Sequence, residues 1–226
     1  MKLSVIIPAY NEAATIRTIL DRVMGTGYEL EVIVVDDGSV DETVSIVENY
    51  GDGRIRLIKH THNQGKGAAL CTGFKEATGD VIIIQDADLE YDPSDYPKLL
   101  APIEDGRADA VMGSRFTGEA QRVHFFWHFV GNKALTLLSN MTTNLNLNDM
   151  EVGYKVMKTE IARQIELKSR DFRCEPEIVA KLARLKCRIY EVPITYAGRS
   201  YEEGKKITWV DGVKALGAIL RFAWSD

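Results

Sequence analysis

Short apolar runs alternate with amphipathic segments along the first half of the chain. Runs rich in Val and Ile are typical of buried strands, and they span residues 3–8, 31–36, 55–60 and 81–86. The segments between them carry apolar residues at helical spacing, over 12–24, 41–50 and 67–77. This alternation of strands and helices predicts an α/β fold in which helices flank a mostly parallel sheet.

The second half of the chain is arranged differently. Strands are predicted over residues 109–113, 154–158 and 188–192. Helices are predicted over 125–141, where the start is aromatic, over 176–185 and over 209–224. Because the sequence contains no internal repeat and no low-complexity linker, we expect one domain over residues 1–226.

Polar residues directly follow the predicted strands of the first half. The segments are Pro8-Ala9-Tyr10-Asn11-Glu12, Asp36-Asp37-Gly38-Ser39 and Asp86-Ala87-Asp88-Leu89-Glu90. Ligands of parallel α/β sheets bind beyond the carboxyl ends of the strands. The sequence therefore predicts one acidic, hydroxyl-rich crevice where these strand ends meet.

The spacing of Asp86, Asp88 and Glu90 is typical of a site for a hard cation. Alternate residues of an extended chain point the same way, so we expect the carboxylates on one side of this segment. Such carboxylates repel one another unless a cation neutralises them, and oxygen ligands favour Mg²⁺ or Mn²⁺. We therefore predict a Mg²⁺ or Mn²⁺ site at which the metal can also bridge a diphosphate.

Other segments can bind the remaining parts of a nucleotide. Gly38 allows a tight turn after Asp36, whose carboxylate can accept hydrogen bonds from a ribose or a base. Gly65-Lys66-Gly67 precedes a predicted helix, where free backbone N–H groups and the Lys66 ammonium can cradle a phosphate. The chain has neither GxGxxG nor GxxxxGK[ST], which argues against dinucleotide dehydrogenases and P-loop NTPases.

Composition limits the partners, the metal sites and the location that can be expected for this protein. The 28 Lys+Arg and 33 Asp+Glu give a net charge of −5, which argues against nucleic acid as a partner and requires any anion site to be local. The cysteines form no CxxC pair, so neither a disulfide framework nor a zinc site is expected. No apolar stretch reaches the roughly 18 residues of a membrane span, and no secretory signal is recognisable. We therefore expect a cytoplasmic protein that meets lipid, if at all, at the membrane surface.

These segments together resemble the family 2 glycosyltransferases, which have the Rossmann-like GT-A fold. The resemblance rests on residues 5–12, 34–39, 63–67, 79–81 and 86–89, and it covers nearly the whole chain. Three later motifs resemble the branch that acts on polyprenyl phosphates, best known from dolichyl-phosphate mannosyltransferases. They are Gly113-Ser114-Arg115, Asp149 followed by Gly153, and Glu191-Val192-Pro193.

The resemblance implies a metal-dependent, inverting transfer of mannose or glucose from a nucleotide sugar, GDP-mannose or UDP-glucose, to a polyprenyl phosphate. It also implies that the domain has a nucleotide-sugar half up to about residue 115 and an acceptor half over about 116–206. An amphipathic helix over about 207–226 completes the chain. We expect such an enzyme to lie peripherally at the cytoplasmic face of the membrane.

Roles for single residues follow from the same resemblance. The nucleotide sugar is expected to contact Pro8, Tyr10, Glu12, Asp36, Lys66 and Asp86, and the expected catalytic residues are Asp88, Arg115 and Asp149. Arg115 would bind the acceptor phosphate. Where this branch commonly has a glutamine the chain has Glu90, and where it has a second arginine the chain has Trp127-His128. His128, Arg199 and Lys205 are therefore further candidates for the acceptor phosphate.

A hydroxyl group of a glycan or small molecule is the alternative acceptor. A phosphate oxygen is already anionic and needs positioning, whereas a hydroxyl needs a general base, for which Asp149 and Glu151 are candidates. The helices over 125–141 and 207–226 either pack into the core or attach to a lipid surface, a membrane-protein partner or a second copy of the chain. A nucleotide-sugar-binding subunit without activity is a further alternative, against which the intact Asp86, Asp88 and Arg115 argue.

Overall fold

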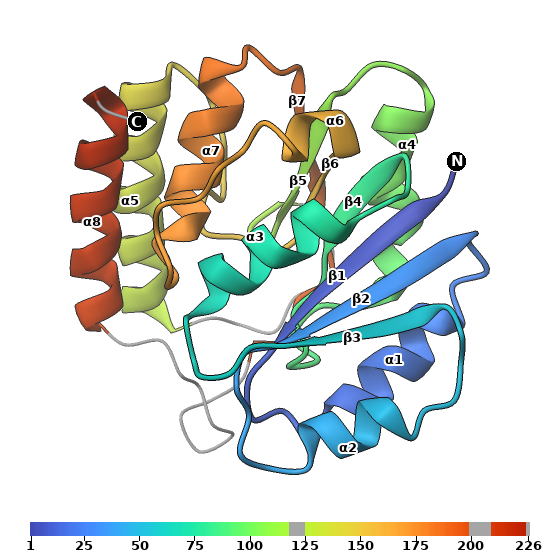
Figure 1. The fold of residues 1–226 in the computed structure, drawn as a ribbon. Coiled ribbons are helices and arrows are strands. Elements are labelled where there is room, and N and C mark those ends of the chain that lie inside the picture. The colour runs from blue at the N-terminus through green and yellow to red at the C-terminus, as the bar shows by residue number, and fades with distance from the viewer. Residues whose placement is uncertain (118–124, 199–208, 225–226) are drawn as a thin grey trace.

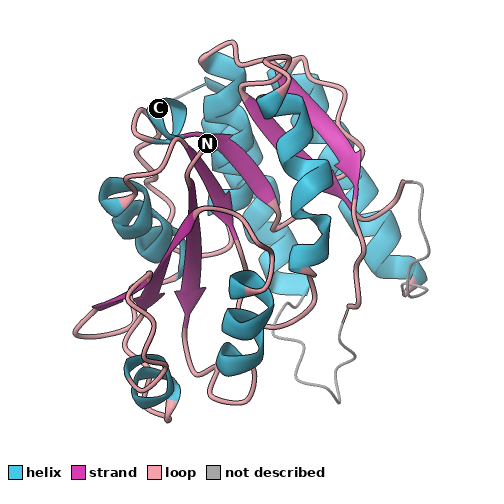
Figure 2. Cartoon of the chain, turned by 90° about the vertical axis from the view of Figure 1, so that its right-hand side faces the viewer, coloured by secondary structure: helices cyan, strands magenta, loops and turns pink. Residues whose placement is uncertain are grey.

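The strands form a single mixed sheet in the computed structural model, which describes residues 1–117, 125–198 and 209–224 (Figures 1 and 2). Their bounds are β1 (Leu3–Ala9), β2 (Leu30–Asp36), β3 (Ile55–Lys59), β4 (Val81–Ile84), β5 (Ala110–Ser114), β6 (Lys155–Lys158) and β7 (Ile189–Pro193). The order across the sheet is β3-β2-β1-β4-β6-β5-β7. Neighbouring strands are parallel except at β6, which is antiparallel to both β4 and β5.

Helices cover both faces of this sheet. They are α1 (Ile16–Met24), α2 (Thr43–Glu48), α3 (Lys66–Glu76), η1 (Pro93–Asp95), α4 (Tyr96–Glu104), α5 (Phe126–Thr143), α6 (Thr159–Ala162), α7 (Cys174–Arg184) and α8 (Trp209–Trp224). Helices α1, α2 and α4 pack on one face, and α3, α6 and α7 pack on the other. Helices α5 and α8 lie side by side beyond α7, at the left of Figure 1.

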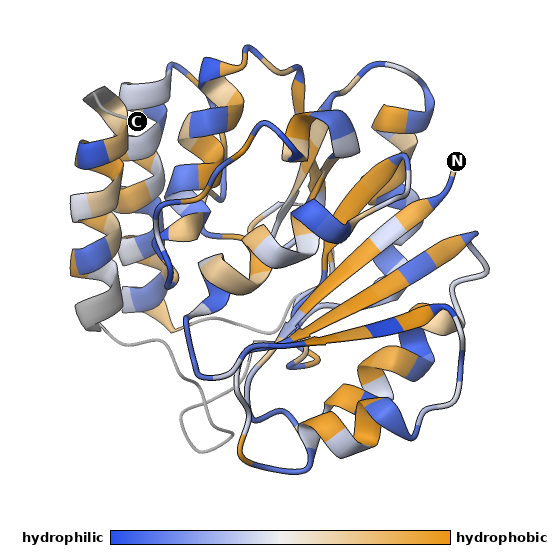
Figure 3. Ribbon diagram, in the orientation of Figure 1, coloured by the Kyte–Doolittle hydropathy of each residue, from blue (hydrophilic) through white to orange (hydrophobic). Residues whose placement is uncertain are grey.

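The strands are apolar throughout because both faces of the sheet are covered. In β1, Val5 and Ile7 belong to the core beneath α1 and α4, whereas Ile6 belongs to the core beneath α3 and α7. Burial on both faces replaces the usual alternation of polar and apolar residues by continuous Val and Ile runs. The hydropathy colours of Figure 3 show these runs along the strands, with hydrophilic residues gathered in many of the connecting loops.

The predicted α/β fold is confirmed, and so are the strands and helices predicted within the described residues, with ends shifted by a few positions. Helices α4 and α6 were not predicted. In α4, Pro97 lies in the first turn and Pro102 inside the helix, and proline normally interrupts the helical pattern. No helix in the described ranges is both long and apolar enough to span a bilayer. Arg199 and Lys205 lie outside the described residues.

Candidate active site

The carboxyl end of β4 carries the acidic segment, but its backbone is not extended. Strand β4 ends at Ile84, a turn follows, and Leu89 has φ 64°, in the left-handed region. Within the turn, the backbone N–H of Glu90 donates to Asp88 Oδ1 at 3.2 Å. The Glu90 carboxylate accepts a hydrogen bond from the Tyr196 hydroxyl at 2.7 Å. The expected row of carboxylates on one side of an extended segment is therefore wrong, because the chain reverses here.

This geometry changes the expected metal site. No group of three or more His, Cys, Asp or Glu side chains is placed to hold a metal in the part of the chain that the structure describes. A Mg²⁺ ion, however, commonly uses one or two protein carboxylates and takes its other ligands from substrate phosphates and water. Asp86 and Asp88 would therefore fit such an ion together with phosphate oxygens of a substrate, and the Glu90 carboxylate already accepts one hydrogen bond from Tyr196.

Lys66 connects the acidic turn to the second half of the chain. Its ammonium lies 2.7 Å from Asp86 Oδ1 and 2.9 Å from Glu175 Oε1, at the start of α7. The other Glu175 oxygen pairs with Lys155, which is fully buried in β6 and also donates to the carbonyl of Val152. Burial alone would lower the pKa of Lys66, but attraction to Asp86 and Glu175 outweighs it and raises the pKa well above its usual value. Lys66 is therefore a fixed, charged ammonium.

The first turn of α3 does not offer the free N–H groups that the sequence led us to expect. The N–H of Gly67 donates to the Arg170 carbonyl at 2.7 Å, and those of Ala68 and Ala69 donate to the Gly65 carbonyl. A Cβ on Gly65 would lie 2.1 Å from the Arg170 carbonyl oxygen, and one on Gly67 would lie 2.0 Å from that of Ser169. These glycines allow the 169–170 loop to cover the helix end, so in this segment the Lys66 side chain remains the candidate for a phosphate.

The two aspartates that follow β2 have different surroundings. Asp37 accepts hydrogen bonds from the Gln64 and Gly65 N–H groups and from His60, and it thereby fixes the loop before α3. Asp36 Oδ2 accepts from Gly38 and Ser39, each at 3.2 Å. Asp36 Oδ1 is buried and has no hydrogen-bond partner among the described residues. An acceptor oxygen without a donor is what a ribose or base site requires.

Pro8, Tyr10 and Glu12 lie at the end of β1, beside the Asp36 turn. Pro8 is paired in register with Val35 of β2, and Tyr10 is exposed. The N–H of Glu12 donates to the Thr43 hydroxyl, and its carboxylate accepts a hydrogen bond from Thr15. The expected nucleotide residues are thus brought to one edge of the sheet.

Arg115, which is partly buried, and the buried Asp149 form an ion pair at the carboxyl end of β5. Arg115 donates from Nε to Asp149 Oδ2 at 2.7 Å and from a terminal nitrogen to Oδ1 at 2.8 Å. Asp149 is fully buried and also accepts from Asn132 of α5 at 3.1 Å. Burial opposes ionisation of Asp149, but the Arg115 charge prevails and lowers the pKa of the carboxyl. A bidentate ion pair of this kind positions the arginine and makes Asp149 a poor general base.

The Lys66–Asp86 and Arg115–Asp149 pairs flank a shared centre formed by Tyr91 and Gly153. The Gly153 N–H donates to the Tyr91 hydroxyl at 2.9 Å. A Cβ on Gly153 would lie 2.4 Å from Asp86 Oδ2 and 2.8 Å from the Tyr91 ring, so only glycine allows this approach. Arg115 in turn lies over the Tyr196 ring at 5.2 Å, next to the Tyr91 ring. The site is therefore continuous from Lys66 to Arg115.

His128 and Glu151 lie at the borders of this site. His128 precedes Asn132 by one helical turn and therefore shares its face of α5, with its ring 5.7 Å from that of Phe125. Glu151 Oε1 is buried and has no hydrogen-bond partner among the described residues. Burial, assisted by repulsion from Glu175, raises the pKa of Glu151 to about 7.

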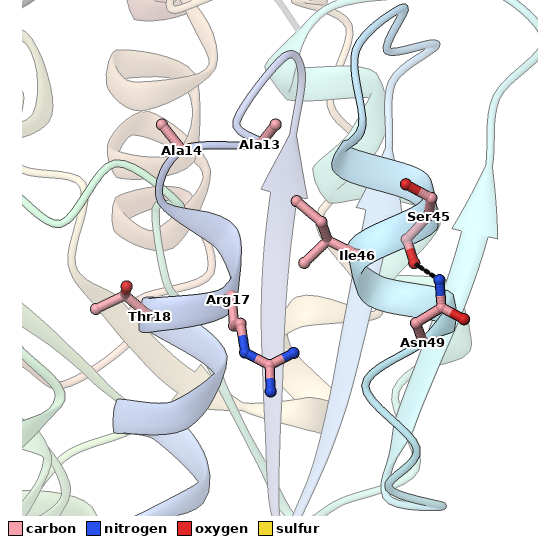
Figure 4. Close-up of a pocket in the computed structure, with 7 residues that line it drawn as sticks. All are labelled: Ala13, Ala14, Arg17, Thr18, Ser45, Ile46 and Asn49. Atoms are coloured by element: carbon pink, nitrogen blue, oxygen red, sulfur yellow. Dashed lines mark hydrogen bonds between the residues drawn. The ribbon is translucent and has the colours of Figure 1, made fainter.

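A separate open pocket of about 440 Å³ lies between α1 and α2 (Figure 4). Ala13, Arg17, Ser45 and Asn49 are among its lining residues, and Ser45 accepts a hydrogen bond from Asn49 there. None of the expected site residues lines this pocket. It is therefore distinct from the site at the strand ends.

The sequence matches the family model of glycosyl transferase family 2 over residues 4–166. The chain belongs to glycosyl transferase family 2. A dolichol-phosphate mannosyltransferase of Pyrococcus furiosus is 31% identical over 211 residues, which are 91% of this chain and 59% of that protein. An undecaprenyl-phosphate mannosyltransferase of Micrococcus luteus is 32% identical, over 91% of this chain and 87% of that protein. This family 2 member thus spans less than two thirds of the first relative and most of the second.

The fold has solved counterparts as well. Glucosyl-3-phosphoglycerate synthase of Mycobacterium tuberculosis, crystallised with Mn²⁺, UDP and glucosyl-3-phosphoglycerate, superposes with a TM-score of 0.77 at 20% identity. The match covers 100% of this chain and 81% of that structure. It confirms the GT-A fold expected for a family 2 glycosyltransferase.

Several residues of the site were not predicted from the sequence: Tyr91, Asn132, Lys155, Glu175 and Tyr196. Asn132 and Glu175 are remote in sequence from the motifs on which the prediction relied. Tyr91, by contrast, directly follows Glu90, and Tyr196 lies three residues after Pro193. Lys155 likewise lies two residues after Gly153, in the motif that begins at Asp149, so nearness to a motif was the signal that could have found these three residues.

Proposed function

We propose that this chain transfers a hexose, with inversion, from a nucleotide-diphosphate sugar to a polyprenyl phosphate. The observation that carries the proposal is the pair of partly buried cations, Lys66 and Arg115, which are connected through the Tyr91–Gly153 centre. One cation suits the diphosphate of a donor and the other suits the phosphate of an acceptor. The names of the Pyrococcus and Micrococcus relatives, both transferases to polyprenyl phosphates, support the same assignment.

On the donor side, the nucleotide lies along Pro8, Tyr10, Glu12 and Asp36, and its diphosphate reaches Lys66. Asp86 and Asp88 would hold a Mg²⁺ or Mn²⁺ ion, which neutralises the charge that develops on the departing diphosphate. The Mn²⁺ in the mycobacterial structures supports a divalent ion in this fold. Lys66 supplies a second positive charge to the same leaving group.

On the acceptor side, Arg115 binds the lipid phosphate and holds one oxygen in line with the sugar carbon. Asp149 orients the guanidinium through its two hydrogen bonds, and Asn132 fixes Asp149 from α5. His128, one turn earlier on α5, adds a donor for the same phosphate. Arg199 and Lys205 are proposed as further ligands of this phosphate. Because the phosphate oxygen is already an anion, this arrangement needs no general base.

We also propose that the protein attaches peripherally to a membrane through α5 and α8. On α5, Trp127 is 77% exposed, Leu137 62% and Met141 73%. On α8, Val213 and Leu220 are exposed as well, while Ala218 and Phe222 are buried. Exposed aromatic and aliphatic side chains on adjacent helices are typical of a surface that enters the lipid interface.

The test is transfer of labelled hexose from GDP-mannose or UDP-glucose to a short polyprenyl phosphate with Mg²⁺ or Mn²⁺. We expect label in the organic phase, lost with EDTA and with Asp88→Ala, and retained in Glu48→Gln, a surface control. Label that stays in the aqueous phase on a hydroxyl compound would contradict the lipid-phosphate acceptor. Absence of donor turnover together with tight, metal-dependent UDP or GDP binding would indicate a binding subunit.

A further inference from the structure

The group that holds Lys66 belongs to the second half of the chain, outside the segments that bind a nucleotide in the proposed function. Glu175, 3% exposed, bridges Lys66 and Lys155 with its two oxygens. Lys155 is itself fully buried and is fixed further by the Val152 carbonyl. The Phe172 ring, just before α7, lies 6.0 Å from the Lys66 ammonium. Lys66 is thus held by α7 and the loop that precedes it as well as by the acidic turn.

We infer that Glu175 is a positioning residue, which keeps the Lys66 ammonium in the site while Lys66 exchanges its bond to Asp86 for a donor phosphate. The inference rests on the proposed function, because it requires that a diphosphate reaches Lys66. It adds residues from β6 and α7 to the donor site, which the strand-end motifs do not include.

The charges of this cluster explain why the exchange needs a fixed partner. Lys66 and Lys155 are balanced by Asp86 and Glu175. Asp86 would release Lys66 if it turned to a metal held with the donor diphosphate, and an ammonium on a four-carbon stem would then follow Asp86 or turn to solvent unless a second carboxylate held it. Glu175 remains bonded to Lys66 throughout, because it is buried and its second oxygen is held by Lys155.

Ionisation of the cluster is consistent with this role. Burial favours the neutral form of Glu175, but the charges of Lys155 and Lys66 outweigh burial and lower the pKa of Glu175. Glu175 is thus a carboxylate at neutral pH. Its geometry therefore provides one permanent anionic partner for Lys66, and Asp86 is the partner that can be exchanged.

The test is a double-mutant cycle with Glu175→Gln and Lys66→Met, in which Mg²⁺ with GDP or UDP is the ligand. We expect Glu175→Gln to weaken binding of whichever nucleotide the wild type prefers by about 10-fold, the cost of one hydrogen bond to a charged group. In the Lys66→Met background the same change should alter binding by less than about 2-fold, because Glu175 acts through Lys66. Glu31→Gln, a hydrogen-bonded carboxylate at the opposite end of β2, is the matched control and should bind as the wild type does.

The outcomes separate the inference from the proposed function. Equal losses in both backgrounds would show that Glu175 is merely structural, and an unchanged affinity in Glu175→Gln would also overturn the inference while leaving the donor site intact. A wild type that binds neither GDP nor UDP would overturn the proposed function together with the inference. If Glu175→Gln fails to fold, the reason would be the buried Lys155 ammonium, which loses its carboxylate partner. The double variant Glu175→Gln with Lys155→Met removes that ammonium, and the same cycle with Lys66→Met is then measured on this protein.

Discussion

The Arg115–Asp149 ion pair gives a direct test of how the acceptor side is built. Asp149→Asn keeps the shape of the side chain but removes its charge, and it leaves the partly buried Arg115 guanidinium opposite a neutral amide. Removing one partner of a buried ion pair costs about 3–5 kcal/mol. Since Asn retains one acceptor oxygen for Arg115, we expect a loss near the lower end, about 3 kcal/mol of unfolding free energy.

Urea unfolding followed by circular dichroism measures this loss. The control is Glu48→Gln, which breaks an exposed pair with Lys59 and should cost at most about 1 kcal/mol. Asp149→Leu combined with Arg115→Met removes both charges and should recover most of the stability. A loss in Asp149→Asn no larger than in Glu48→Gln would refute the reasoning, because the pair would then be solvated and not buried.

The same variants separate positioning from base catalysis. For a lipid-phosphate acceptor, Asp149→Asn should mainly raise the KM for that acceptor, because Arg115 is less well held. A general base would instead lower kcat by several orders of magnitude, with little change in KM. The lowered pKa of Asp149 means that its stabilising contribution is complete above its ordinary pKa near 3.8 and is lost as the pH falls below it. This acid-sensitive part of the stability should be absent from Asp149→Asn.

Three further predictions concern other parts of the molecule. The folded protein favours the protonated form of Glu151, whose pKa is raised from 4.5 to about 7, so the free energy of unfolding should fall by up to ~3 kcal/mol as the pH rises through that interval. Calorimetry should show this fall in the wild type and not in Glu151→Gln. Gly65→Ala places a Cβ at a φ of 94° and 2.1 Å from the Arg170 carbonyl oxygen, so it should lower the melting temperature, unlike Gly53→Ala, where no atom lies within 4 Å. Trp127→Ser with Leu137→Ser should reduce flotation with vesicles of anionic phospholipid, and an undiminished flotation, equal to that of Val40→Ser, would contradict attachment through α5.

The fold could be predicted because the strands are buried on both faces. Runs such as Val81–Ile84 lie between two helical layers, so their composition alone distinguishes them from the helices around them. The polar segments after β1, β2 and β4 were also predictable as one site, since parallel strands place their carboxyl ends at one edge. The direction of β6 was not predictable, because no local pattern records the hydrogen bonds between strands that are distant in sequence.

The details of the site depended on contacts that the sequence does not show. The turn at Asp86–Glu90 reverses through a left-handed Leu89, a conformation that leucine rarely adopts and that no propensity would suggest. Gly65 and Gly67 were expected to expose N–H groups, but their role is to admit the 169–170 loop, about a hundred residues later in the chain. A glycine that allows a backbone to approach cannot be distinguished, from sequence, from one that allows a ligand to approach.

The pairing of Lys66 and Arg115 with carboxylates bears on how a chain with a net charge of −5 would bind the phosphates of the proposed function. Lys66 and Arg115 are each paired with acidic groups of the chain, so the site carries little unbalanced positive charge. A phosphate that binds to Lys66 or Arg115 would displace a carboxylate from the cation or bind beside that carboxylate. The affinity should then depend on how well Asp86 is drawn to the metal, which releases Lys66. Metal and donor should consequently bind cooperatively, so that Mg²⁺ tightens nucleotide binding much less in Lys66→Met than in the wild type.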